Sequence, residues 1–186
     1  MAELTRRVML AASTLFMEGV CAMAAGTDKQ AWGFSFPGID GGTLDFQAFE
    51  GRVLLVTNTA SFCGYTYQYD ALQKLHEAKQ SAGLVVIGVP SQDFNQESAD
   101  NKTVKDFCDT RFGIDFPMSA LAHVRGPEAA PFYAWVNAQA HWQPAWNFNK
   151  VLIGRDGRIL GTFGSSEEPE GPALTKAVGA ALAATV

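Results

Sequence analysis

The sequence predicts an α/β sandwich in which a central mixed β-sheet is flanked by helices. Two continuous apolar runs, residues 52–58 and 84–89, are typical of strands that are buried on both faces. A segment whose apolar residues recur at helical spacing separates these two strands. A later apolar run meets an Asp-Gly turn, which is typical of a β-hairpin, and an alanine-rich helix closes the chain.

The first half of the chain supplies a small hairpin and a strand–helix–strand unit. Residues 32–36 and 43–45 bracket the glycine-rich turn 38–42, and this pattern predicts the hairpin. Residues 67–81 carry apolar side chains near helical spacing, and Gly83 is a typical helix end. We therefore expect a helix between the two buried strands.

The second half supplies a helix, a hairpin and a closing helix. Residues 103–112 predict the first of these helices, and residues 150–153 and 158–163 predict the two strands of the hairpin. The closing helix spans 172–184, with a proline in its first turn. This order of elements is typical of a thioredoxin-like sandwich, and we expect one domain over residues 26–186.

The composition of the chain excludes several classes of protein. Hydrophobic residues make up 47% of the 186 residues and charged residues 18%, which predicts a packed core. Fourteen Lys and Arg residues against nineteen Asp and Glu residues give a net charge of −5. This balance argues against a nucleic-acid-binding protein and against attachment to anionic lipid. Outside the N-terminal stretch, no apolar run is long enough to span a bilayer as a helix.

The N-terminal stretch has the order of charges and apolar residues that is typical of an export signal. Arg6 and Arg7 precede the apolar segment 8–17, and small residues at 22–24 suit cleavage by a signal peptidase. The paired arginines resemble a twin-arginine signal. We therefore expect residues 1–25 to be removed and the mature protein to be periplasmic or secreted. The alternative is an amphipathic N-terminal helix on a cytoplasmic protein.

The chemistry of the chain points to Cys63, which follows the strand 52–58 by five residues and precedes a predicted helix. A cysteine at such a junction meets a helix N-terminus and unpaired backbone N–H groups, and both favour the nucleophilic thiolate. The alternative is an inert cysteine that packs as a small hydrophobic residue.

The neighbours of Cys63 narrow the reaction that it can perform. A dithiol oxidoreductase or a copper chaperone needs a second cysteine nearby, but residues 64–67 contain none. The three cysteines and three histidines are too scattered for a zinc site, so we expect no metal and no organic cofactor. A single activated cysteine favours peroxide reduction through a sulfenic acid.

Three motifs follow one another along the chain. Residues 57–66, Thr-Asn-Thr-Ala-Ser-Phe-Cys-Gly-Tyr-Thr, resemble the signature of the glutathione peroxidase family around its catalytic cysteine or selenocysteine. Residues 88–97 resemble the second block, which ends in a catalytic Gln followed by Glu, and residues 146–150 resemble the third block. The likeness runs from about Phe34 to the C-terminus, and three ordered motifs are far more specific than one.

This resemblance implies roles for four residues of this sequence. Cys63 corresponds to the peroxidatic nucleophile, and Gln96, Trp146 and Asn147 correspond to the rest of a catalytic tetrad. Amide and indole N–H groups can donate to a sulfur anion and to the oxygen that leaves as the O–O bond breaks. Taken singly, Trp146 would be interpreted as a core residue and Gln96 as a solvated loop residue. The family resemblance thus implies the tetrad.

The resemblance also implies a role for Cys108, since short-loop members of the family often place a resolving cysteine in this segment. Some of these relatives carry it at the position that Asp109 occupies here. The alternative is a buried structural cysteine. A disulfide needs Cα atoms within roughly 7 Å, so we expect the helix 103–112 to unwind locally before Cys63 and Cys108 can join.

The second block departs from the family pattern in four places. Gln92 and Asn95 replace the usual Asn and Gly, Ser98 replaces a Pro, and one residue is missing before Gln96. The loop before the third block is short, which implies the branch that is often monomeric and frequently prefers thioredoxin-like reductants to glutathione.

The function implied by the residues and the resemblance is that of a thiol-dependent peroxidase, active in antioxidant defence. We expect Cys63 to reduce hydrogen peroxide and organic hydroperoxides, and a thioredoxin-like protein or glutathione to restore the thiol. The alternative is a thioredoxin-fold binding or redox-sensing module without efficient turnover, which the altered second block would favour.

Overall fold

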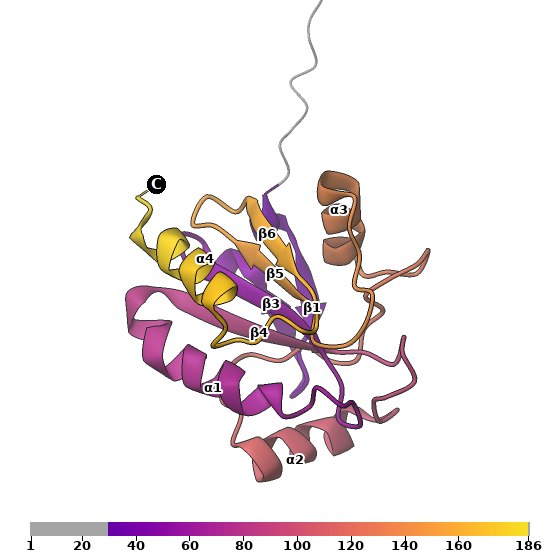
Figure 1. Ribbon diagram of the computed structural model, residues 1–186. Coiled ribbons are helices and arrows are strands. Elements are labelled where there is room, and N and C mark those ends of the chain that lie inside the picture. Colours follow the sequence, from indigo (N-terminus) through magenta and orange to yellow (C-terminus); the bar gives the residue numbers. More distant parts are fainter. Residues whose placement is uncertain (1–29, 186) are drawn as a thin grey trace, which may run out of the picture.

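The computed structural model describes residues 30–185 and places a four-stranded sheet at the centre of the molecule (Figure 1). The export signal expected in residues 1–25 lies outside the described residues. The strand order is β4-β3-β5-β6, in which β3 and β4 are parallel and the other two pairs are antiparallel. The strands span Val53–Thr59 (β3), Leu84–Pro90 (β4), Lys150–Ile153 (β5) and Ile159–Phe163 (β6).

Four helices and a small hairpin surround this sheet (Figure 1). The helices span Gln68–Lys79 (α1), Asn101–Phe112 (α2), Pro131–Ala140 (α3) and Pro172–Ala183 (α4). The hairpin consists of Ser35–Pro37 (β1) and Thr43–Asp45 (β2), and short 3-10 helices span Ala31–Gly33 (η1), Phe46–Phe49 (η2) and Gln80–Ala82 (η3). This arrangement is the thioredoxin-like α/β sandwich that the sequence predicts.

The two faces of the sheet carry separate hydrophobic cores, because alternate residues of a strand point to opposite faces. On one face, Leu55 lies in the same core as Leu72 of α1 and Leu174 of α4. On the other face, Leu54 lies in the same core as Phe132 of α3. Every residue of β3 and β4 is buried, as the two continuous apolar runs predict.

The predicted helices and central strands are confirmed, but the predicted strand 32–36 is wrong in its first half, because residues 31–33 form the 3-10 helix η1 and β1 begins at Ser35. One helix was also omitted. Gly83 has a φ of +106°, a left-handed conformation that glycine adopts easily, and it ends the segment that contains α1 and η3. The omitted element is α3, whose residues Phe132, Tyr133, Trp135 and Val136 are all buried. A helix with so many apolar residues has little contrast between its faces, so its period is hard to detect.

Candidate active site

Three loops that carry the predicted site residues leave the sheet at one edge. The parallel strands β3 and β4 both end there, since Thr59 pairs with Pro90. The antiparallel strand β5 begins at the same edge, where Lys150 pairs with Thr57. The topology therefore gathers the loop with Cys63, the loop with Gln96 and the segment with Trp146 and Asn147.

Cys63 lies in a tight turn between β3 and α1. Its backbone N–H donates to Thr66 Oγ1 at 3.0 Å, and the Thr66 hydroxyl donates to the Ala60 carbonyl at 2.9 Å. The Tyr65 N–H lies 3.4 Å from the sulfur and donates to it. With only 9% of Cys63 exposed, this backbone donor can stabilise a thiolate away from bulk water.

Gln96 and Asn147 are joined directly by a side-chain hydrogen bond. Asn147 Nδ2 donates to Gln96 Oε1 at 3.1 Å, which leaves the NH2 group of Gln96 as a donor for another acceptor. The backbone carbonyl of Gln96 accepts the backbone N–H of Phe62 at 2.9 Å, so Gln96 also contacts the Cys63 turn. Asn147 is fully buried. Two members of the predicted tetrad, Gln96 and Asn147, are therefore in contact, and Gln96 also contacts the residue before Cys63.

Trp146 and Asn147 are adjacent in sequence but differ in burial, and the backbone after them is irregular. Phe148 has a φ of +59°, in the left-handed region that L-residues rarely adopt. Trp146 remains 40% exposed, with its ring centroid 5.3 Å from that of Phe94. Within residues 30–185, no hydrogen bond joins the Cys63 sulfur to a side chain of the other three tetrad residues. The structure therefore joins Gln96 to Asn147, and the tetrad around the sulfur stays a prediction.

Asn58 is a positioning residue that the sequence analysis missed. Its Nδ2 donates to the Trp146 carbonyl at 3.0 Å, and its Oδ1 accepts the Asn149 N–H at 3.1 Å. Its carbonyl accepts the Phe148 N–H at 2.6 Å. A polar residue inside a fully buried strand was the signal, since buried amides need hydrogen-bond partners.

Lys150 is a second residue that the sequence analysis missed, and its side chain links segments that lie next to the site. Its ammonium group is fully buried and donates to Gln68 Oε1 and to the Glu167 carbonyl, both at 2.6 Å. Burial lowers the pKa of Lys150 to about 8. These contacts tie the start of α1 to the start of β5, and so connect two of the loops that form the site.

Cys108 lies on the buried face of α2, in the same hydrophobic core as Cys63. Burial raises the pKa of the Cys108 thiol to about 11, so the thiol is protonated near neutral pH. Both cysteines are free thiols. The structure therefore places the predicted resolving cysteine, Cys108, inside the protein as a free thiol. Its neighbour Asp109 is exposed and forms an ion pair with Lys105.

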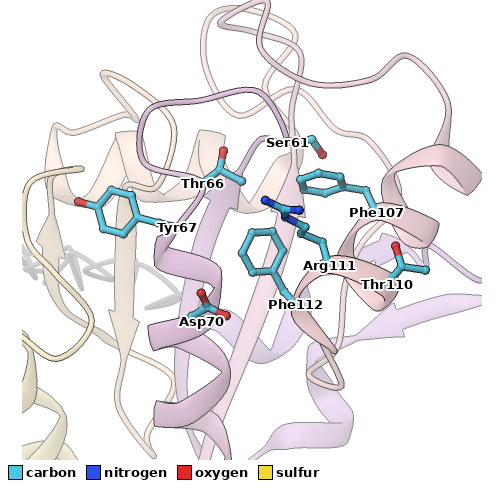
Figure 2. Close-up of a pocket in the computed structure, with 8 residues that line it drawn as sticks. All are labelled: Ser61, Thr66, Tyr67, Asp70, Phe107, Thr110, Arg111 and Phe112. Atoms are coloured by element: carbon cyan, nitrogen blue, oxygen red, sulfur yellow. The ribbon is translucent and has the colours of Figure 1, made fainter.

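A pocket of about 700 Å³ opens between the Cys63 turn and α2 (Figure 2). Tyr67, Phe107 and Phe112 give it aromatic walls, and Arg111 and Asp70 contribute one charge of each sign. This volume lies within the usual range for sites that bind small molecules. The pocket can therefore admit an organic molecule beside the turn that carries Cys63.

The described part of the chain shows neither a metal site nor a membrane-spanning helix. No group of three or more His, Cys, Asp or Glu residues in residues 30–185 is placed to hold a metal ion. No helix in the same range is long and apolar enough to cross a membrane.

Comparison with known proteins identifies the family of this chain. The family model described as glutathione peroxidase matches residues 32–137. The hydroperoxy fatty acid reductase gpx1 of Synechocystis is 35% identical over 159 residues, which cover 80% of this chain and 94% of that protein. The thioredoxin/glutathione peroxidase BtuE of Escherichia coli is 34% identical over 170 residues, which cover 78% of this chain and 93% of that protein.

A solved structure agrees with these relatives. The crystal structure of Trgpx in its apo form superposes with a TM-score of 0.66 at 30% identity, covering 83% of this chain and 96% of the other. The similarity thus extends over both the sequence and the fold of most of this chain. This chain belongs to the glutathione peroxidase family and is a thiol-dependent peroxidase that reduces hydroperoxides.

Proposed function

We propose that Cys63 is the peroxidatic nucleophile of this enzyme and that Gln96, Trp146 and Asn147 assist it. The observation that carries this proposal is the meeting of their three loops at one sheet edge, with Asn147 bonded to Gln96 and Gln96 bonded to the Cys63 turn. In the first step the Cys63 thiolate attacks one peroxide oxygen and the O–O bond breaks. Cys63 becomes a sulfenic acid, and the other oxygen takes a proton and leaves as water or an alcohol.

The second half of the proposed cycle restores the thiol. The Cys108 thiol condenses with the sulfenic acid, so that a disulfide forms and water leaves. An external thiol then reduces this disulfide in two exchange steps. The Escherichia coli relative is a thioredoxin/glutathione peroxidase, which supports a thioredoxin-like protein or glutathione as the donor.

The proposed substrates are hydrogen peroxide and organic hydroperoxides. The aromatic pocket beside the Cys63 turn supports the organic class, and so does the Synechocystis relative, which is a hydroperoxy fatty acid reductase. Steady-state consumption of hydrogen peroxide and of cumene hydroperoxide, with dithiothreitol as donor, tests this proposal. We expect turnover of both. A protein that consumes neither would be a binding or redox-sensing module instead.

The indole of Trp146 is proposed to donate to the reacting atoms. Trp146→Phe keeps an aromatic ring against Phe94 but removes the only N–H donor of the side chain. We expect the second-order rate constant with hydrogen peroxide to fall at least tenfold, since a lost anion-stabilising donor costs about 2.7–4 kcal/mol. Rapid-quench alkylation of Cys63 measures this rate. Trp142→Phe is the matched control, and an unchanged rate in Trp146→Phe would make Trp146 a packing residue.

Export to the periplasm, or secretion, is also proposed, with residues 1–25 as a signal that is removed. The paired residues Arg6 and Arg7 before an apolar segment support this proposal. N-terminal sequencing of the native protein is expected to begin near Gly26. A native protein that begins at Met1 or Ala2 would contradict export by cleavage and favour a cytoplasmic enzyme.

A further inference from the structure

The loop that carries Gln96 is anchored by a carboxylate that the proposed reaction does not use. The side chain of Asp93 is only 10% exposed. Its Oδ2 accepts the backbone N–H of Val124 at 2.7 Å and that of Arg125 at 3.2 Å. Its Oδ1 lies 2.6 Å from Nδ1 of His123. One carboxylate therefore ties the loop after β4 to a segment about 30 residues further along the chain.

The backbone between Asp93 and Gln96 needs such an anchor. Asn95 has a φ of +55°, a left-handed conformation that costs a residue with a side chain some energy. The turn is closed by the Asn95 N–H, which donates to the Gln92 carbonyl at 2.8 Å. Gln96 is the next residue, so the direction of its side chain depends on how this turn is held.

The same anchor reaches Trp146 through Phe94. The Phe94 ring centroid lies 5.3 Å from the Trp146 ring and 5.3 Å from the Arg125 guanidinium carbon. Arg125 donates its backbone N–H to Asp93, so Phe94 is held between the anchored segment and the indole. A cation over an aromatic ring adds a further attraction at this contact.

The charges around the anchor favour a pair between Asp93 and His123. The hydrogen bond and the negative charge of Asp93 raise the pKa of His123. Glu128 lies on the other side of the imidazole, with its Oε2 3.9 Å from Nε2. The imidazole of His123 and two backbone N–H groups together surround a carboxylate that is largely withdrawn from water.

From these contacts we infer that Asp93 is a positioning residue for the reaction of Cys63 with hydroperoxides. It acts through the backbone that aims Gln96 and through the Phe94 contact with Trp146. Asp93 itself touches no reacting atom. The inference rests on the proposed function, because it assigns a role in the first step of that reaction.

A double-mutant cycle tests this role. Asp93→Ala is expected to lower the second-order rate constant of Cys63 with hydrogen peroxide at least tenfold, since small misplacements of a catalytic group have effects of about 10–100-fold. In a background that carries both Gln96→Ala and Trp146→Phe, the same substitution is expected to lower the rate by less than about threefold, because both side chains through which Asp93 acts are then altered and coupled residues are not additive. The rate at which dithiothreitol reduces the oxidised protein should stay the same in all four proteins.

Conservative variants separate positioning from general stability. Asp93→Asn keeps an oxygen that can accept the N–H groups of Val124 and Arg125, so it should recover most of the rate. Glu128→Gln changes the other carboxylate near His123 and should match the wild type. If Asp93→Ala does not fold, Asp93→Ser replaces it in the cycle.

The outcomes distinguish this inference from the function on which it rests. Wild-type rates in Asp93→Ala, or equal losses in the wild-type background and in the background with Gln96→Ala and Trp146→Phe, would overturn the positioning role and leave the peroxidase in place. A wild-type protein that does not react with hydrogen peroxide would overturn the proposed function, and this inference with it.

Discussion

Cys63→Ser is expected to abolish hydroperoxide turnover, with a loss of at least about 10³-fold. A serine hydroxyl at this position is protonated and far less nucleophilic than a thiolate, and it cannot form a sulfenic acid. The backbone donor from Tyr65 and the turn closed by Thr66 would remain, so the site keeps its shape. Loss of hydrogen peroxide with dithiothreitol as donor measures the effect.

Cys108→Ser is the matched control for this substitution, because it makes the same chemical change in the same hydrophobic core. Its first reaction with hydrogen peroxide should proceed at close to the wild-type rate. Thermal unfolding followed by circular dichroism shows whether both variants fold. Equal turnover by wild type and Cys63→Ser would remove Cys63 from the mechanism.

Cys108→Ser is expected to lose hydroperoxide turnover when a thioredoxin-like protein is the electron donor. Without the resolving thiol, no disulfide forms for the donor to attack, and Cys63 should stall as a sulfenic acid or proceed to the sulfinic acid. We expect a loss of at least about tenfold with that donor, since disulfide exchange depends on which sulfur is accessible. Dithiothreitol, a small thiol, should still support turnover.

The burial of Cys108 explains why this step needs a local opening. Helix α2 is a surface helix: only Val104 and Cys108 are fully buried, and Phe107 and Phe112 pack against the core from partly exposed positions. Such segments open at a smaller free-energy cost than the core strands do. Leaving the core would also remove the burial that raises the pKa of Cys108 to about 11. Opening of α2 therefore both moves the thiol and makes it easier to ionise.

Asp109→Ala provides the control for the resolving role, because Asp109 neighbours Cys108 but lies on the exposed side of α2. This variant should turn over normally with both donors. Normal turnover by Cys108→Ser with a thioredoxin-like donor would show that the donor attacks Cys63 directly. Cys108 would then be a structural residue.

Much of the fold follows from local patterns in the sequence. Apolar residues make up most of β3 and all of β4, which is typical of strands buried on both faces. The dipeptide Asp-Gly alone predicts the turn between β5 and β6. Helix α3 was missed because several of its exposed positions carry alanine, so its two faces differ little in polarity, although Pro131 marked its first turn. A helix is easiest to predict when one of its faces is clearly polar.

The sequence names the residues of the proposed site but does not predict how they are arranged. The three motifs gave Cys63, Gln96, Trp146 and Asn147, whereas the support for them comes from contacts distant in sequence. Asn58 bonds to Trp146 across 88 residues, and Asp93 bonds to Val124 across 31. Only the tertiary structure brings such partners together, so no local pattern could reveal them.

Trapping of the oxidised cysteine tests the central claim most directly. Cys108→Ser protein is treated with one equivalent of hydrogen peroxide in the presence of dimedone, which reacts with sulfenic acids, and its peptides are mapped by mass spectrometry. Our account predicts one adduct, on Cys63, in proportion to the peroxide consumed. An adduct elsewhere, or peroxide consumed while Cys63 remains a free thiol, would contradict the assignment of Cys63 as the peroxidatic residue.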